Sequence, residues 1–372
     1  MLIMIFSMTT WRFLWQRSHH LASRLAKRGS DVVYFQRPIF LSPIEFIRAY
    51  REHNFFLERR VAERITVVNL FLPNLTWRFR FASEKFGLVA FKMELRFLRI
   101  KPNVAIFQSL GYAFLLDTLR SMKVKIIYDC IDEVSVFYSP VEASKEREII
   151  EKSSLVFVVS RRLREKVSKL NSKCVYVPNA VDFEHFYSAT QIKEKPQDVR
   201  NLKHPIVGFY GYIFDWTDID LICKLAQAHP DYSILFVGPV RFGMGELEKH
   251  SNITMLGTRD YKVLPQYLSM MDVCLIPFKL NKLTLSSNPI KLYEYLAAGK
   301  PVVSTALPEV CENASEFVMI AHNHDDFIKK VEKAVNEIKS EDKEMLLRRI
   351  DFARRNSWEK RIETIEELIR NV

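Results

Sequence analysis

Lys291 and Glu294 are the residues whose types and spacing point most clearly to chemistry. They lie in the stretch NPIKLYEYLAAGKPVV, where an Asn-Pro pair signals the start of a helix and a glycine signals its end, which predicts a helix over 289–298. A lysine in the first turn of a helix is disfavoured by the helix dipole by about 0.3–1 kcal/mol. The same lysine is well placed if an anion such as a phosphate binds at the helix start.

Glu294 follows three residues later, on the same face of the predicted helix. A carboxylate one turn deeper could accept two hydrogen bonds from a diol such as a ribose. A phosphate together with a ribose indicates a nucleotide. The alternative is a solvent-facing Lys–Glu ion pair that contributes a few tenths of a kcal/mol.

The segment NPIKLYEYLAAGKPVVST resembles the donor-binding motif of GT-B glycosyltransferases. It is most similar to the branch of bacterial teichuronic-acid and other exopolysaccharide transferases. The resemblance implies that Lys291 contacts the donor diphosphate and that Glu294 binds the ribose, with the neighbouring Ser287, Asn288 and Ile290 also at the nucleotide-sugar site. Many retaining members carry a second glutamate eight residues before the first, where this chain has Ser286, so inversion and retention both stay open.

The fold implied by the resemblance is α/β, with two Rossmann-like doubly wound domains that face a cleft. Short apolar runs alternate with helical segments in both halves of the chain, which independently favours parallel strands with crossover helices. We expect an acceptor-binding domain at 1–187, a linker at 188–204 and a nucleotide-sugar-binding domain at 205–355. Residues 356–372 are expected to form a helix, which the resemblance implies returns to the first domain.

Two loops of the second domain are further candidates for the donor site. Gly211 and Tyr212 follow the predicted strand 205–210, where a glycine lets backbone N–H groups approach a phosphate. Thr258 and Tyr261 follow the predicted strand 253–256, at the place where the family covers the nucleobase. Taken alone, each could equally be an ordinary polar turn.

Asp132 is the candidate catalytic base, and Asp129 is the second choice. Both follow the predicted strand 124–128, and in open α/β sheets ligands bind beyond the carboxyl ends of the strands. A carboxylate there could take a proton from an acceptor hydroxyl, which is also the role the resemblance implies. The alternatives are a helix cap or a solvated loop. Arg17, His19 and His20 come near consideration, although surface or packing roles fit the histidines better.

The positive charge is concentrated in the first third of the chain. Residues 1–127 contain 21 Lys and Arg against 8 Asp and Glu, an excess of 13, whereas the remaining residues contain 34 against 36. Two segments in this part, 44–56 and 76–100, mix aromatic and arginine residues at helical spacing. Such helices can lie on an anionic membrane surface, or their aromatic faces can belong to the core.

The composition also limits the chemistry. The five cysteines are scattered without a CxxC pair, and no apolar stretch approaches the roughly 20 residues that span a bilayer. We therefore expect no disulfide framework and no zinc site, and a cytoplasmic protein that is peripheral on the inner face of the cell membrane. No cofactor and no obligatory metal are expected, since the resemblance implies that lysine, helix dipole and backbone amides neutralise the diphosphate.

The function predicted from the sequence is transfer of a sugar from a nucleotide-sugar, expected to be a UDP-sugar, to a lipid-linked or growing surface polysaccharide. One alternative is a GT-B nucleotide-sugar epimerase, which would need an acidic and histidine constellation that the second-domain glycine loop lacks. The other is a basic nucleic-acid-binding protein. It is disfavoured because the Arg-Phe segments have helical spacing inside an α/β pattern, so no nucleic-acid partner is expected.

Overall fold

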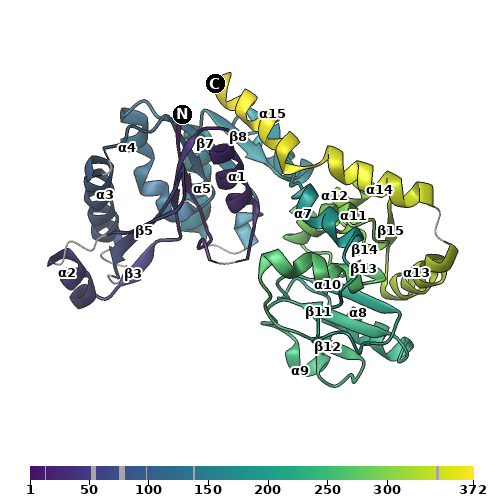
Figure 1. Cartoon of the computed structure of the whole chain (residues 1–372). Coiled ribbons are helices and arrows are strands. Elements are labelled where there is room, and N and C mark those ends of the chain that lie inside the picture. Colours follow the sequence, from purple (N-terminus) through teal and green to yellow (C-terminus); the bar gives the residue numbers. More distant parts are fainter. Residues whose placement is uncertain (13, 52–55, 75–79, 98, 137–138, 341–342) are drawn as a thin grey trace. The chain divides into compact units, whose positions relative to one another are not determined.

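The computed structural model describes all residues except 13, 52–55, 75–79, 98, 137–138 and 341–342. The described residues form two compact units (Figure 1). Unit 1 contains Met1–Val159, Leu163–Val177 and Ile362–Val372, and unit 2 contains Ser160–Arg162 and Pro178–Arg361. Each unit is built on a largely parallel sheet, which confirms the predicted α/β class.

The sheet of unit 1 has the strand order β3-β5-β2-β1-β6-β7-β8-β9, and β4 pairs antiparallel with β5. Its central strands are apolar on both faces because helices cover both sides, as is usual for parallel sheets. The strands are β1 (Leu2–Phe6), β2 (Asp31–Phe35), β3 (Ile39–Leu41), β4 (Phe56–Ala62), β5 (Ile65–Pro73), β6 (Val104–Phe107), β7 (Lys125–Cys130), β8 (Leu155–Val158) and β9 (Cys174–Tyr176).

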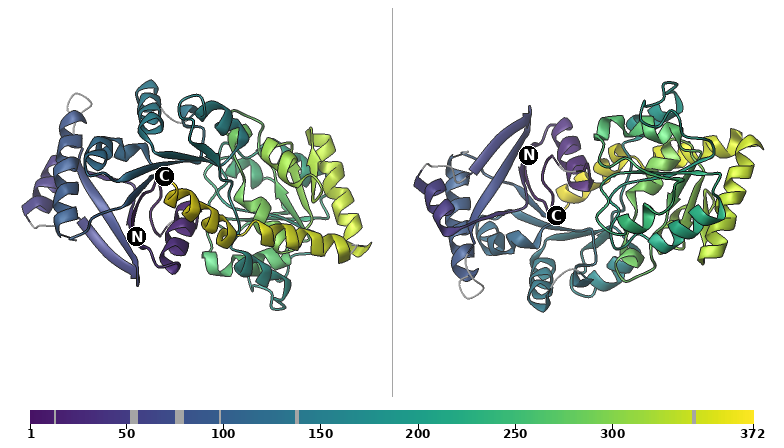
Figure 2. Two further views of the ribbon diagram at one scale, coloured as in Figure 1. Left: turned by 90° about the horizontal axis from the view of Figure 1, so that it is seen from above. Right: turned by 90° about the horizontal axis from the view of Figure 1, so that it is seen from below.

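Six helices connect these strands in the described residues. They are α1 (Arg17–Lys27), α2 (Pro43–Arg51), α3 (Arg80–Phe97), α4 (Leu116–Ser121), α5 (Pro140–Lys152) and α6 (Arg161–Val167). The C-terminal helix α15 (Trp358–Arg370) belongs to unit 1 from Ile362 onward. There Glu366 accepts a hydrogen bond from the Arg28 guanidinium at 2.7 Å, and Lys125 reaches the carbonyl of Ile369. Both termini therefore lie on unit 1 (Figure 2).

The sheet of unit 2 has the order β12-β11-β10-β13-β14-β15, and its strands are all parallel. Alternate residues of β10 point to opposite faces: Val207 and Phe209 pack with α8 and α13, whereas Ile206 and Tyr210 pack with α10 and α11. The strands are β10 (Ile206–Tyr210), β11 (Ser233–Val237), β12 (Ile253–Met255), β13 (Val273–Ile276), β14 (Val302–Thr305) and β15 (Val318–Ala321).

The helices of unit 2 complete the two layers around its sheet. They are α7 (Phe183–Tyr187), α8 (Ile219–Ala228), α9 (Met244–Leu247), α10 (Leu264–Met270), α11 (Ile290–Ala297), α12 (Pro308–Ala314), α13 (His324–Glu337) and α14 (Lys343–Arg355), followed by the start of α15. From β10 to α13, strands and α-helices alternate along the chain, as the sequence predicted for this half.

The structure corrects the interpretation of residues 40–101. The predicted helical segment 44–56 ends as α2 at Arg51. Residues 52–55, 76–79 and 98 of the two predicted helices lie outside the described residues. Between the helices, β4 and β5 form an antiparallel pair, and β5 also pairs in parallel with β2. The sequence reading missed this insertion, although ITVVNLFLP has the β-branched and apolar residues typical of a strand.

The boundary between the units also differs from the prediction. Residues 178–187 were assigned to the first domain and 188–204 to a linker, but both segments belong to unit 2. Phe183 and Phe186 of α7 are buried in the core of unit 2, together with Ala189 and Val199 of the supposed linker. Most residues between these buried positions are polar, so the sequence shows no apolar periodicity that would have predicted the contacts.

Candidate functional site

Three glycine loops meet at the carboxyl edge of the unit 2 sheet. Gly211, Gly238 and Gly257 follow β10, β11 and β12, and all three have positive φ angles of 139°, 144° and 69°. The amide of Gly238 donates to the carbonyl of Gly257 at 2.8 Å, and a Cβ on Gly238 would lie 1.9 Å from the carbonyl oxygen of Gly211. At position 238 only glycine allows the two loops to approach this closely.

Lys291 lies beside the first of these loops, in the first turn of α11. A Cβ on Gly211 would come within 3.0 Å of the Lys291 Cε atom, so the lysine stem lies across the glycine. The Nζ atom is 3.4 Å from Oε2 of Glu294 and 5.2 Å from the ring centroid of Tyr210. The structure therefore brings the two predicted donor residues together with the predicted glycine loop.

Glu294 is buried, so it does not form the solvent-facing ion pair that was the alternative interpretation. Its Oε2 atom accepts a hydrogen bond from the Tyr210 hydroxyl at 2.9 Å, whereas Oε1 accepts none from the described residues. Burial, followed by the charge of Glu294, raises the pKa of Tyr210 well above its usual value. Tyr210 thus stays protonated and holds the carboxylate in place, with one oxygen left for a ligand hydroxyl.

The start of α11 offers unused backbone donors next to Lys291. The amides of Ile290 and Lys291 donate no hydrogen bond within the described residues. At its other end the helix closes as predicted: Gly299 has φ 69° and donates to Leu296, and Lys300 donates to Tyr295. Two free N–H groups and an ammonium at one helix start are a suitable arrangement for a phosphate.

Asn288 does not cap α11, which corrects the predicted helix start by one residue. The residue at the cap position is Pro289, and the Asn288 side chain donates instead to the Tyr293 hydroxyl and to Glu309 at 3.2 and 3.1 Å. Its Oδ1 accepts from the backbone amide of Asn179 at 3.1 Å. Asn288 is 4% exposed, so its role in the described structure is to fix the turn that precedes Lys291.

The two serines before α11 are held by their own turn. Ser287 donates to the carbonyl of Thr284 at 2.7 Å and remains half-buried. Ser286, which stands where many retaining relatives have a glutamate, is fully buried and donates to the carbonyl of Lys282 at 3.2 Å. Ser286 therefore supplies no acidic group to the site.

The remaining predicted donor residues, Tyr212, Thr258 and Tyr261, differ in their contacts. Tyr212 follows Gly211 and stacks on Phe214 at 5.4 Å between ring centroids. Thr258 is exposed directly after Gly257. Tyr261 instead stacks on His185 of α7 at 4.4 Å.

His185 and its neighbour Phe186 are site residues that the sequence reading missed. His185 also binds the backbone carbonyl of Tyr261 at 2.9 Å, and Phe186 stacks on Tyr210 at 5.9 Å. These contacts connect the loop after β12 to the Tyr210–Glu294 pair. The only sequence signal was the aromatic run FEHFY, which looked like an end of the first domain.

Asp129, the second catalytic candidate, lies in unit 1 and inside β7 rather than after it, because the strand extends to Cys130. It is fully buried, and its two oxygens accept hydrogen bonds from Arg17 at 2.8–3.1 Å and from Gln108 at 2.8 Å. A carboxylate paired in this way favours an anchoring role over proton transfer.

Asp132 follows β7 on the same edge of the unit 1 sheet, as predicted, and is half-buried. Burial raises its pKa to about 6, which suits a general base that works near neutral pH. His19, by contrast, has a pKa lowered to about 4 by burial. Its ring is held between the carbonyl of Thr10 and the amide of Gln16, so it fixes a loop in the neutral form.

Comparison with known proteins gives independent results. A family model described as "Glycosyl transferases group 1" matches residues 205–337. A Bacillus subtilis (strain 168) protein described as "Putative teichuronic acid biosynthesis glycosyltransferase TuaH" is 30% identical over 267 residues, and the match spans 66% of this chain and 66% of that protein. The match to the family model covers most of unit 2, including Lys291 and Glu294.

Solved structures are similar over nearly the whole chain. Trehalose-6-phosphate synthase has a TM-score of 0.76 at 11% identity, covering 100% of this chain and 99% of its own. Sucrose-phosphate synthase from Thermosynechococcus elongatus has a TM-score of 0.72 at 14% identity, covering 100% and 98%. Anabaena HepE, in a complex with UDP-glucose, has a TM-score of 0.72 at 12% identity, covering 100% of both chains. At these identities the similarity shows a shared fold.

Proposed function

Because the chain belongs to the GT-B glycosyltransferases, we propose that it moves a sugar from a UDP-sugar to a lipid-linked or growing surface polysaccharide. The observation that carries the proposal is the pairing of Lys291 with buried Glu294 beside the loop of Gly211. The name of the Bacillus subtilis relative supports a surface polysaccharide as acceptor, and the UDP-glucose complex of the Anabaena protein supports a UDP-sugar as donor.

In this proposal the start of α11 holds the donor diphosphate. Lys291 would donate a charge-assisted hydrogen bond to a phosphate oxygen, and the amides of Ile290 and Lys291 would add two more donors. The glycine at position 211 leaves room for the phosphate beside the lysine stem. A positively charged site of this kind stabilises the leaving nucleoside diphosphate as negative charge develops on it.

We propose that this site neutralises the diphosphate without an obligatory metal ion. Within the described ranges, no group of three or more His, Cys, Asp or Glu residues could hold a metal. The charge on the leaving group would then fall to Lys291 and the helix start. Turnover should therefore persist in the presence of a chelator.

Release of free nucleotide from a panel of nucleotide-sugars tests the function directly. We expect release from a UDP-sugar to rise when a lipid-linked saccharide acceptor is added, and to persist with EDTA. A panel in which no donor loses its nucleotide faster with any acceptor than without would contradict transferase activity. A requirement for added metal would contradict only the metal-free mechanism.

Glu294→Gln is expected to reduce the discrimination between UDP and its 2′- or 3′-deoxy analogues. A buried carboxylate that accepts a ribose hydroxyl is penalised when the hydroxyl is missing, by roughly tenfold or more for a charged acceptor. Calorimetry with the three nucleotides measures the difference. Glu246→Gln, which removes an exposed ion pair with Lys249, is the control. If the variant weakens all three nucleotides equally, Glu294 supports the fold and not ribose selection.

Unit 1 has an exposed apolar surface that bears on where the acceptor is bound. Helices α2 and α3 pack together through Phe46 and Phe86, whose ring centroids are 5.8 Å apart. The two helices also expose large apolar residues, with Phe97 at 78% and Ile44 at 75% exposure. We call this the α2–α3 face: Ile44, Ile47, Phe86, Val89, Met93 and Phe97.

The α2–α3 face is flanked by exposed basic residues, namely Arg48, Lys85, Lys92 and Arg96. Apolar side chains surrounded by cations match the surface of an anionic bilayer, where rings enter the acyl boundary and cations remain at the headgroups. We propose that the enzyme rests on the membrane through this face, next to a lipid-linked acceptor. No helix in the described part of the chain is long and apolar enough to cross a bilayer.

The double substitution Phe86→Ser and Phe97→Ser is expected to reduce binding to anionic vesicles by about tenfold or more, because two rings no longer enter the apolar layer. Co-sedimentation with vesicles of varied anionic lipid content and salt measures the effect. Leu347→Ser on α14, which removes a similarly exposed apolar residue from unit 2, should leave binding unchanged. Vesicle binding that ignores the double substitution and the lipid charge would contradict the proposed location.

A further inference from the structure

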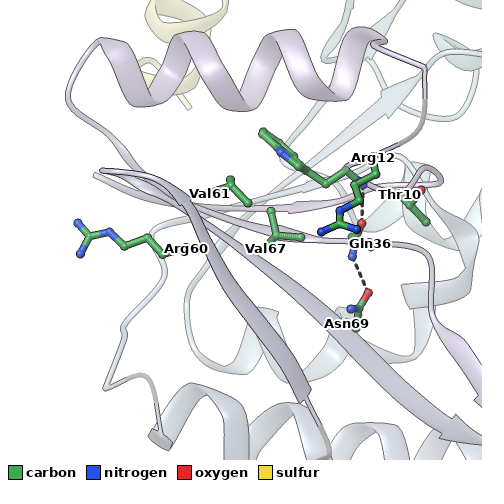
Figure 3. Close-up of a pocket in the computed structure, with 8 residues that line it drawn as sticks. Thr10, Arg12, Gln36, Arg60, Val61, Val67 and Asn69 are labelled. Atoms are coloured by element: carbon green, nitrogen blue, oxygen red, sulfur yellow. Dashed lines mark hydrogen bonds between the residues drawn. The ribbon is translucent and has the colours of Figure 1, made fainter. Parts of the chain in front are cut away.

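Unit 1 contains a second candidate binding site, a pocket of about 660 Å³ at the carboxyl ends of β1 and β2 (Figure 3). Its volume is in the range of small-ligand sites. Segments from the loop after β1, the residue after β2, and strands β4 and β5 form its walls. The described residues that line it are Thr10, Trp11, Arg12, Gln36, Arg60, Val61, Val67 and Asn69.

Polar groups on one wall of the pocket are suited to sugar hydroxyls. The Gln36 side chain accepts a hydrogen bond from the backbone amide of Trp11 and donates to Oδ1 of Asn69. The Asn69 side-chain amide has no acceptor among the described residues, and Thr10 is exposed. Gln36 therefore fixes the orientation of Asn69 and leaves a donor toward the pocket (Figure 3).

Trp11 adds an aromatic surface to the pocket. Its ring packs edge-on against Tyr34 at 5.0 Å and against Trp15 at 5.7 Å, and the residue is only partly buried. These contacts hold the indole in one orientation while part of it stays accessible. A fixed aromatic face can cover the apolar C–H face of a sugar ring, and neighbouring amides bind the hydroxyls.

The charge of the pocket is positive and unbalanced. Its described lining contains two arginines and no carboxylate. The guanidinium of Arg60 donates to the backbone carbonyl of Glu63 and points away from the other labelled residues (Figure 3). Arg12 also lines the pocket, is exposed and forms no ion pair with the described residues. An anionic ligand group would therefore meet Arg12.

We propose that this pocket binds an anionic sugar unit of the acceptor, with its charged group on Arg12 and its ring over Trp11. The charged group is a carboxylate, as in a uronic acid, or a phosphate ester, since both accept hydrogen bonds from a guanidinium. The place of this site in the reaction rests on the proposed transferase function. Binding of the saccharide itself can be measured without turnover.

The test compares matched saccharides by titration at about 0.15 M salt, where long-range attraction is screened. The probes are a glucuronate-containing tetrasaccharide, its carboxyl-reduced neutral form, a glycan bearing a phosphate ester, and inorganic phosphate. The variants are Arg12→Gln in the pocket and Arg64→Gln outside it, where Arg64 forms an exposed pair with Asp31. UDP binding to each protein is measured in parallel.

We expect at least one anionic saccharide to bind the wild-type chain about tenfold tighter than the neutral form, and Arg12→Gln to remove that preference. Arg64→Gln should retain it, and the stronger of the two anionic glycans identifies the charged group. Equal binding of neutral and anionic saccharides, an unchanged preference in Arg12→Gln, or binding of inorganic phosphate alone would overturn the proposal. Failure of UDP to bind the wild-type chain would instead contradict the transferase function.

Discussion

Replacing Asp132 with asparagine is expected to lower kcat by about 10²–10⁴, the usual range for loss of a positioned general base, while the affinity for UDP stays unchanged. The carboxylate follows β7 at the edge of the sheet where ligands of doubly wound folds bind. Nucleotide release with a saturating donor and acceptor measures the rate. Calorimetry with UDP serves as the control for unit 2.

The pKa of Asp132 adds a pH signature to this prediction. Because burial raises it to about 6, the wild-type rate should rise with pH up to about 6 and then level off, and the asparagine variant should lack this step. A raised carboxyl pKa means that the folded state favours the protonated form, so wild-type stability should fall as pH rises toward 6. At pH 7.5 the variant should therefore melt no lower than wild type.

Near-normal turnover in a folded Asp132→Asn protein would exclude Asp132 as the base. His20 and His19 were the next candidates from the sequence. Nδ1 of His20 is 3.0–3.1 Å from donors on Trp15 and Arg24, and His19 is buried and holds its loop. The remaining explanation would then be a mechanism without a protein base. Such a mechanism stays open because Ser286 stands where many retaining members have a glutamate, so the sequence does not decide between inversion and retention at the transferred sugar.

Asp129→Asn is expected to destabilise unit 1 by about 3–5 kcal/mol, the range for breaking a buried ion pair. Arg17 is 4% exposed and Asp129 is 0% exposed, so loss of the carboxylate would leave a buried guanidinium without its counter-charge. Gln108 would lose a charged acceptor at the same time. Urea unfolding followed by far-UV circular dichroism measures the change.

Asp31→Asn is the matched control, because Asp31 pairs with Arg64 at 3.0 Å on the surface of the same unit. An exposed pair contributes about 0–1 kcal/mol. If Asp129→Asn unfolds at the same urea concentration as Asp31→Asn, the Arg17–Asp129 pair does not anchor β7. Lost activity in a fully stable Asp129→Asn protein would point back to a catalytic role.

The parts of the structure that could be predicted from sequence are those set by local signals. The predicted strands at 205–210 and 124–128 are short apolar runs, and the structure has β10 at Ile206–Tyr210 and β7 at Lys125–Cys130. The helix α11 was recognisable because Pro289 and Gly299 mark its ends, and Lys291 was conspicuous because a lysine opposes the dipole at that position. These signals depend only on residues within a few positions of one another.

The parts that were missed depend on partners far along the chain. Asp129 is held by Arg17, 112 residues earlier, and no local pattern reveals that pair. Asn288 looked like a helix cap, but it contacts Asn179 and Glu309. The segment of α7 looked like the end of a domain, although His185 stacks on Tyr261, 76 residues later.

Calorimetry of UDP and uridine binding to Lys291→Ala is the most direct test of the proposed nucleotide site. Loss of a charge-assisted contact worth about 1.5–3 kcal/mol should weaken UDP binding by roughly 10- to 150-fold and leave uridine binding nearly unchanged. Lys249→Ala, from the exposed pair with Glu246, should affect neither ligand. The difference between UDP and uridine is the readout, because a general folding defect would weaken both. Unchanged UDP affinity in a folded Lys291→Ala protein would contradict the assignment of α11 to the donor diphosphate.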